Sequence, residues 1–360
     1  MPSQGKTPCF FLGANTPKGY YSRFDQLLNY DPKGKCFLIK GGPGTGKATL
    51  MKKVAEALKE KGLEPELIYC TADTDSLDAV ITPDGSFAIL DATLPHAVEP
   101  KYAGAYETTV SLCDCWDEAV LKKNSEKIME FFDKNRELHE RGRRYIAAAA
   151  NLFDEAARLS LDTISQEKVA KTALRVCARE FKKRRRRPGT EKIRFLSGVT
   201  DRGIFTFDET AEALCDRIYV LEDDCGAASR IFMSTVRRTA LDFGLDIITC
   251  RCSIFPTEKI EHVFIPELHL GFMTSNKRHP VAAPPYRVIH AKRFVDEKKF
   301  AKYKIRIRFT LRAATELINE AVRCMKEAKT VHDELESLYI PAMDFSLVEK
   351  KLESVLSAIE

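Results

Sequence analysis

Short apolar runs alternate along the chain with longer segments whose apolar residues recur at helical spacing. The apolar runs have the length of strands and cover residues 36–39 (CFLI), 66–70 (ELIYC) and 87–90 (FAIL). Helical spacing is found over residues 50–61, which Gly62 can cap, over 116–182, and over 298–360 with an interruption around 339–341. Buried strands that alternate with helices predict an α/β fold in which helices cover both faces of a parallel sheet.

The chain also repeats itself in tandem. Residues 11–19 (FLGANTPKG) recur as 195–203 (FLSGVTDRG). Three further pairs match in the same order: 58–70 with 241–252, 80–93 with 263–276, and, more loosely, 151–159 (NLFDEAARL) with 330–338 (TVHDELESL). We therefore expect a duplication, with one domain over residues 1–187 and a second over 188–360, each ending in a helical tail.

The first loop of the first half (residues 41–49) has the composition of a phosphate-binding loop. It reads Gly41, Gly42, Pro43, Gly44, Thr45, Gly46, Lys47, Ala48, Thr49. Its glycines let backbone amides turn inward around a phosphate, and the helix that follows adds its positive end. Lys47 would bring a full charge to the outer phosphates. A tight turn with an incidental lysine is the alternative, but the strand before and the helix after favour a P-loop.

A triphosphate site also needs a magnesium anchor. Asp91 ends the third apolar run, where an acidic residue usually holds the metal through water. The hydroxyl that normally follows the lysine is missing, because residue 48 is alanine. Thr49 is expected to contact an inner phosphate instead. The sequence therefore predicts that nucleotide binding is largely kept, whereas metal affinity and turnover are reduced, since Mg²⁺ tolerates several water ligands.

Further polar residues follow the predicted strands, at the sheet edge where ligands bind in α/β folds. His96 and Glu99 are candidates for ordering an attacking water or binding a second substrate, and His96 as a structural prop is the alternative. Asp73, Asp75 and Asp78 either face the same cleft or cap a turn. Lys47, Asp91 and His96 are thus the candidate catalytic residues. Residue 92 is alanine rather than glutamate, which argues against vigorous hydrolysis.

The second half has lost this chemistry. In its second loop (residues 222–230) an alignment without gaps places Ser229 at Lys47 and Arg230 at Ala48, and Thr274 aligns with Asp91. Asp223 and Asp224 would repel a triphosphate, or they would occupy the helix N-terminus as internal anions. We therefore expect a second repeat that binds no nucleotide. Arg202 and Arg230 are candidates for donating charge to the first site.

Composition adds little to this interpretation. The net charge of +5 is small for 360 residues and comes largely from the basic run at residues 182–187, which is either a solvated linker or a nucleic-acid contact without interleaved aromatic residues. We find no secretory signal and no apolar stretch of spanning length. The eleven scattered cysteines form no zinc or disulfide pattern. A reducing cytoplasm is the expected location.

The chain resembles a poorly characterised family of bacterial P-loop ATP-binding proteins with two tandem repeats. The resemblance is carried by FFLGANTPKG (10–19), GGPGTGK (41–47), DATLPHAVEPKYAGAYE (91–107), EHVFIPEL (261–268) and HDELESLYIPAMDF (332–345). It implies ATP as the nucleotide and ATP hydrolysis as the activity, and it implies no further substrate.

Three functions follow as hypotheses. The first is a P-loop NTPase in which ATP and Mg²⁺ drive a conformational change between the repeats. The second is a kinase that passes the γ-phosphoryl group to a small acceptor. The third is a nucleotide sensor or scaffold without turnover, which Ala48 favours. Nucleic-acid binding through residues 182–187 is weaker than all three.

Overall fold

The first half of the chain builds one six-stranded sheet. The computed structural model describes residues 7–27, 33–95, 97–182 and 184–359. The strand order is β1-β5-β6-β7-β4-β8, and a hairpin of β2 and β3 stands beside it. The elements are β1 (Cys9–Phe11), β2 (Gly13–Thr16), β3 (Gly19–Ser22), β4 (Lys35–Lys40), α1 (Lys47–Glu60), β5 (Glu66–Tyr69), β6 (Leu77–Ile81), β7 (Phe87–Asp91) and β8 (Glu107–Ser111).

The second half builds a sheet of the same kind. Its order, β9-β13-β14-β15-β12-β16, reproduces that of the first sheet strand by strand, so the predicted duplication is confirmed. The elements are β9 (Glu191–Arg194), β10 (Ser197–Thr200), β11 (Gly203–Thr206), α5 (Asp208–Leu214), β12 (Arg217–Glu222), α6 (Ala227–Asp242), β13 (Ile247–Arg251), β14 (Ile260–Ile265), β15 (Leu270–Ser275) and β16 (Arg287–His290).

Both sheets are mixed, so the predicted all-parallel sheet is wrong. Strand β6 runs antiparallel to β5 and β7, and β14 runs antiparallel to β13 and β15. The reason is the length of the connections. Residues 70–76 and 82–86 join β5 to β6 and β6 to β7. Links this short allow a hairpin but not the crossover that parallel neighbours require. Strands β7, β4 and β8, which flank the first loop, are parallel as predicted.

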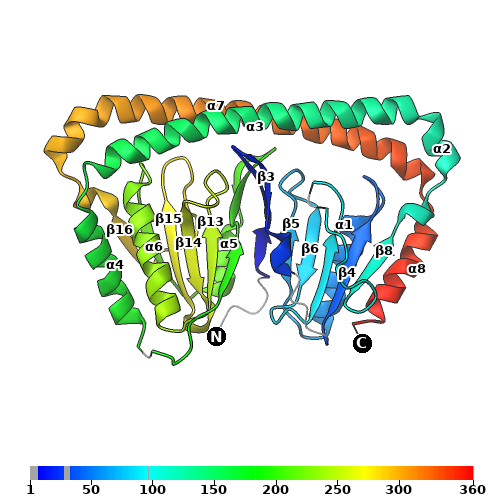
Figure 1. Ribbon diagram of the computed structural model, residues 1–360, viewed down its shortest axis with the longest axis horizontal. Helices are drawn as coiled ribbons and strands as arrows, with labels where there is room; N and C mark the ends of the chain where they lie inside the picture. The colour runs from blue at the N-terminus through cyan, green and yellow to red at the C-terminus, as the bar shows by residue number, and fades with distance from the viewer. Residues whose placement is uncertain (1–6, 28–32, 96, 183, 360) are drawn as a thin grey trace.

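Two long helices connect the halves and exchange their tails. Helices α3 (Ser125–Leu161) and α7 (Glu297–Tyr339) lie side by side across the whole molecule (Figure 1), and α2 (Glu118–Lys123) precedes α3. Helix α3 leads from the first sheet to α4 (Gln166–Glu180), which packs on α6 of the second repeat. Helix α7 leads back to α8 (Phe345–Leu356), which packs on α1 of the first repeat. Each repeat is therefore covered by the helical tail of the other. The domain boundary after residue 187 remains a prediction.

The two sheets meet at their edge strands. Phe11 and Phe195, which occupy equivalent positions of the repeats, exchange main-chain hydrogen bonds of 2.8 and 2.9 Å. Rings from both halves surround this bridge, including Tyr21 against Phe195 and Phe207 against Phe11. The contact is thus built from the same stretch of sequence used twice.

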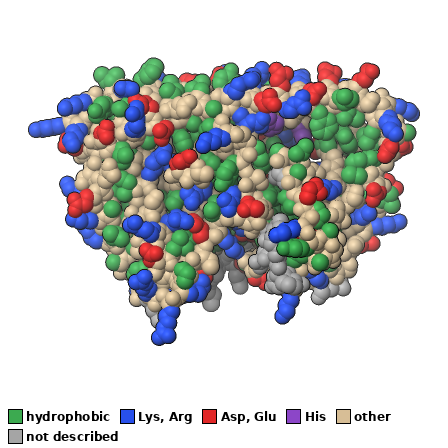
Figure 2. All heavy atoms as spheres, viewed as in Figure 1, with side chains coloured by type: hydrophobic (Ala, Val, Ile, Leu, Met, Phe, Trp, Pro, Cys, Tyr) green, Lys and Arg blue, Asp and Glu red, His purple; other side chains and the backbone are tan. Residues whose placement is uncertain are grey.

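The surface shows charges of both signs. Lys and Arg side chains are interspersed with Asp and Glu over the face seen in Figure 2, so the net charge forms no single basic field there. Within the described residues, no helix combines the length and apolar character needed to cross a membrane. The eleven cysteines, all of them described, are free thiols.

Candidate functional site

The first loop has the shape that its glycines predict. Strand β4 ends at Lys40 and helix α1 begins at Lys47, so residues 41–46 form the connection. Gly44 and Gly46 have φ angles of +66° and +91°. These angles lie in the left-handed region, where a side chain would be strained. Gly46 is also the residue before the first turn of α1, so the loop leads directly into the helix N-terminus.

Lys47 and Asp91 come together as predicted. The Lys47 Nζ donates hydrogen bonds to the carbonyl oxygens of Gly41 (3.1 Å) and Gly42 (2.7 Å) and lies 3.6 Å from Asp91 Oδ2. Strand β7 pairs with β4 in parallel, with Ile39 opposite Asp91, which puts the carboxylate at the carboxyl end of the neighbouring strand. The loop and the end of β7 therefore place a cation and a carboxylate side by side.

The orientation of Asp91 is fixed by its own turn. Its Oδ1 accepts hydrogen bonds from the Thr93 amide (2.9 Å) and the Thr93 hydroxyl (2.6 Å), so Oδ2 remains on the side of Lys47. Ala48 is half-buried beside Lys47 and offers no ligand atom, and the side chain of Thr49 is exposed. Of the residue at the end of β7 and the two that follow Lys47, Asp91 is thus the one that offers a side-chain oxygen beside Lys47.

The segment after Asp91 is fastened to β4. Lys40 Nζ donates to the carbonyl oxygens of Ala92 (2.8 Å) and Val98 (3.0 Å) and to Glu99 Oε1 (2.7 Å). Glu99, a candidate for ordering water, is thus engaged with Lys40. His96, the third candidate catalytic residue, lies outside the described residues.

The acidic residues after β5 turn toward the second half of the chain. Asp73 accepts hydrogen bonds from the Asp75 amide and the Ser76 hydroxyl and lies 3.5 Å from Lys329 of α7. Burial alone would raise the pKa of Asp73, but the Asp75 amide and Lys329 outweigh it and hold that pKa below its usual value. Asp75 forms an ion pair with Arg202. Arg202 therefore does reach the first repeat, although it contacts Asp75 and not the loop.

Residues that the sequence did not predict cover the first loop. Glu336, near the end of α7, accepts a hydrogen bond of 3.1 Å from the Gly44 amide through Oε1. The Tyr339 ring lies against Gly42, where an added Cβ would come within 2.7 Å of Tyr339 Cε1. The segment 332–345 was visible as a motif of the resemblance, but nothing local in it points to a loop almost 300 residues away.

The second loop is shorter than the first, which corrects the alignment. Only residues 223–226 separate β12 from α6, and Gly226 with φ +78° precedes the helix as Gly46 does. Lys47 therefore corresponds to Ala227, not to Ser229, and Ala48 corresponds to Ala228. The correspondence of Asp91 and Thr274 is confirmed, because Leu221 pairs with Thr274 as Ile39 pairs with Asp91.

Asp223 fills the second loop from within. Its Oδ1 accepts hydrogen bonds from the amides of Cys225 (3.2 Å) and Gly226 (3.1 Å), and its Oδ2 accepts one from Ser229 (2.8 Å). The predicted internal anion at the N-terminus of α6 is confirmed. The amides that could hold a phosphate at this helix N-terminus are therefore already engaged by Asp223.

The remaining basic candidates have acidic neighbours. Arg230 lies 3.4 Å from Asp154 of α3, on the side of the second sheet. In the run at 182–187, Arg185 pairs with Glu267 and Arg187 with Asp246. The hydrogen bond from Arg187 holds the pKa of Asp246 well below its usual range. These pairs favour the interpretation of the run as a solvated link rather than a nucleic-acid contact.

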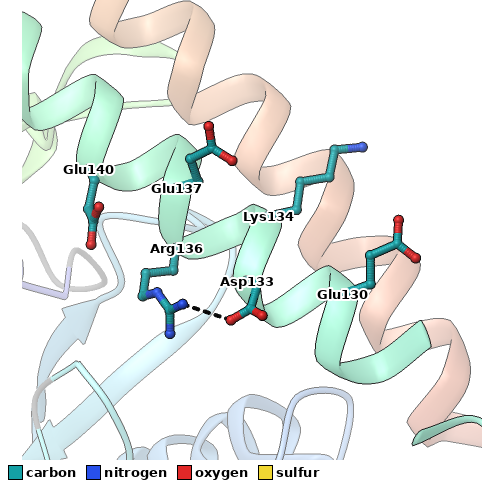
Figure 3. Close-up of a pocket in the computed structure, with 6 residues that line it drawn as sticks. All are labelled: Glu130, Asp133, Lys134, Arg136, Glu137 and Glu140. Carbon is teal, nitrogen blue, oxygen red and sulfur yellow. Dashed lines mark hydrogen bonds and ion pairs between the residues drawn. The ribbon is translucent and has the colours of Figure 1, made fainter. Parts of the chain in front are cut away.

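A shallow hollow on α3 offers little chemistry. Its lining comes from one helix, and the side chains point to solvent with a single ion pair drawn among them, between Arg136 and Asp133 at 2.8 Å (Figure 3). The lining residues are Glu130, Asp133, Lys134, Arg136, Glu137 and Glu140. This hollow therefore offers no alternative to the first loop as a candidate site.

Comparisons with protein-family models, with curated proteins and with solved structures found no match for this chain.

Proposed function

We propose that this chain binds ATP with Mg²⁺ at the first loop and that binding alters how the two repeats sit against each other. The observation that carries the proposal is the position of Lys47 Nζ, on the loop carbonyls and 3.6 Å from Asp91 Oδ2. Inward amides, a helix N-terminus, a cation and a nearby carboxylate are together what a magnesium triphosphate requires. ATP is preferred over GTP because of the family resemblance and because the sequence has no N-K-x-D segment to read guanine.

The residues fit the phosphates better than the metal. Gly44, Gly46 and Lys47 match the needs of a phosphate chain, whereas Mg²⁺ would find Asp91 but no hydroxyl at residue 48. Bound Mg²⁺ supplies charge neutralisation to the phosphates. With Ala48 and Ala92 at the two positions that usually support hydrolysis, turnover is slow, and the protein acts mainly through binding.

Calorimetric titration with ATP and Mg²⁺ tests the proposal. Wild type should bind, and Lys47→Ala should abolish binding because the charge over the phosphates is lost. Lys52→Ala is the matched control, because Lys52 is an exposed lysine five residues further along α1 and should leave the affinity unchanged. GTP, titrated in the same way, should bind more weakly. Absence of binding in wild type, or equal loss in both lysine variants, would remove the basis of the proposal.

A nucleotide sensor without turnover is the second candidate. It is favoured by Ala48 and by the second loop, where Asp223 stands in the place of a nucleotide. Phosphate release measured on the same samples separates the two: a sensor binds ATP and releases no phosphate, even over hours and with excess Mg²⁺.

A further inference from the structure

Each of the two loops holds a carboxylate of the protein itself, but the two carboxylates have different origins. In the second repeat it is Asp223, the first residue after β12. In the first repeat the residue after β4 is Gly41, and the carboxylate is Glu336 from α7. The matching tails place Ala157 of α3 at the position of Glu336. In the second repeat the carboxylate therefore comes from the loop itself. In the first repeat it comes from α7, a long helix of the second half of the chain.

We propose that Glu336 occupies the place of a nucleotide phosphate oxygen in the first loop and that ATP binds by displacing it. The end of α7 then becomes part of the nucleotide site and moves when the site fills. This inference rests on the proposed function, because displacement requires a nucleotide. A carboxylate and a triphosphate cannot both accept from the Gly44 amide, since like charges at such distances repel strongly.

The contacts of the two carboxylates differ in the way that displacement requires. Asp223 is buried and accepts from the amides of Cys225, Gly226 and Ser229. The Glu336 side chain is 35% exposed; its Oε1 accepts a hydrogen bond from the Gly44 amide and lies 3.9 Å from His332 Nδ1 on the same helix. A phosphate would gain further amides and Lys47, which now rests on loop carbonyls. The second loop is thus closed permanently and the first reversibly.

The segment after Glu336 is placed to report the displacement. Tyr339 packs on Gly42 of the loop, and its ring centroid lies 5.9 Å from that of Trp116, the only tryptophan of the chain. Main-chain hydrogen bonds tie residues 115–117 to 342–344. Helix α7 has 43 residues, about 65 Å of length, and begins beside the second sheet. A shift of its end therefore acts on an element shared by both repeats.

Affinity measurements test the displacement. In calorimetric titrations with ATP and Mg²⁺, Glu336→Ala should bind about tenfold more tightly than wild type, because the internal competitor is gone. Glu336→Gln, which keeps the size and loses the charge, should also bind more tightly. Glu334→Ala is the matched control, since Glu334 is exposed on the same helix two residues away and should leave the affinity unchanged.

Trp116 emission gives a second readout that does not depend on turnover. ATP should change the emission of wild type as Tyr339 leaves Gly42, and it should not do so in Lys47→Ala. Two results would overturn the displacement but leave the nucleotide site in place. One is that wild type binds ATP and Glu336→Ala binds it equally or more weakly; the other is that ATP binds without a change in Trp116 emission. If neither wild type nor Glu336→Ala bound ATP, the proposed function itself would fail, and the displacement with it.

Discussion

Arg194 of the second repeat and Glu66 of the first form a bidentate ion pair that is almost fully buried between the two sheets, with side-chain exposures of 2% and 8%. The pair joins β9 to β5 beside the bridge between Phe11 and Phe195. Water is excluded from both charges, so each depends on the other. The ion pair thus makes the contact between the repeats specific, because a slipped arrangement would leave a buried charge without its partner.

Removing one partner of this pair should therefore be costly. Arg194→Ala leaves the Glu66 carboxylate buried without a counter-charge, and we expect it to lower the free energy of unfolding by about 3–5 kcal/mol. Urea unfolding followed by circular dichroism measures the loss. The double variant Arg194→Met with Glu66→Leu is the control and should regain most of it, because apolar groups of similar volume remove both charges. A loss below about 1 kcal/mol in the single variant would show that the pair is hydrated in solution.

The exchange of tails predicts that neither half is stable alone. Residues 1–187 lack α8, whose Val348, Leu352 and Val355 are buried with the apolar face of α1. Residues 188–360 lack α4, whose Val169 and Val176 are buried with α6. Each fragment would expose an apolar stripe to water. Expressed separately, both fragments should be insoluble or unfolded, and expressed together they should copurify as one species on size exclusion. A folded, monomeric fragment 1–187 would contradict the exchange.

Much of the first repeat could be predicted from local sequence. The apolar runs at 36–39, 66–70 and 87–90 became β4, β5 and β7 within one or two residues, because buried strands need continuous apolar side chains. Strand β6 was missed, although Pro83-Asp84-Gly85 after an apolar run is a hairpin signal. Because β6 was missed, the sequence predicted a parallel sheet where the structure has a mixed one.

Only part of the candidate site could be predicted from the sequence. Lys47 and Asp91 could be predicted because each belongs to a local motif, the glycine-rich loop and the acidic end of an apolar strand, and the structure brings them together. Glu336 and Tyr339 could not, because an acidic residue near the end of a long helix is ordinary surface sequence until the fold brings it to Gly44 and Gly42. The shorter length of the second loop could not be predicted either, because only the start of α6 at Ala227 shows that Gly226 corresponds to Gly46.

Asp223 should stabilise the second repeat. Asp223→Ala removes the carboxylate from the amides of Cys225, Gly226 and Ser229 at the start of α6, and we expect a loss of about 1–2 kcal/mol. Thermal unfolding at neutral pH measures it. Asp224→Ala is the matched control, because Asp224 bonds only with the Lys277 amide among the contacts described for its carboxylate and is expected to cost well under 1 kcal/mol. Equal effects of the two variants would argue that the internal anion has no special role.

His262 makes stability depend on pH. The ring is fully buried, no described residue bonds to either ring nitrogen, and burial lowers its pKa to about 3 from 6.5. The unfolded chain binds a proton below pH 6.5 whereas the folded chain does not, so stability is present above pH 6.5 and is lost as the pH falls toward 3. Between pH 7 and pH 5 the loss from this residue is about 2 kcal/mol. Urea unfolding at both pH values should show a smaller difference in His262→Leu than in wild type, and identical differences would mean that water reaches the ring.

A hydroxyl at residue 48 should restore part of the chemistry that the first loop lacks. Ala48 follows Lys47 in the first turn of α1, so Ala48→Ser places an oxygen where a magnesium ligand normally stands. If Asp91 and the loop bind Mg·ATP as proposed, the variant should bind Mg²⁺ more tightly and release phosphate about tenfold faster or more. Phosphate release at several Mg²⁺ concentrations measures both. The matched control is Ala228→Ser, the same change at the equivalent position of the second repeat, where Asp223 already fills the loop and no gain is expected. A gain in the control, or none in Ala48→Ser despite tight ATP binding, would place the limit on turnover elsewhere, with Ala92 as the next position to change.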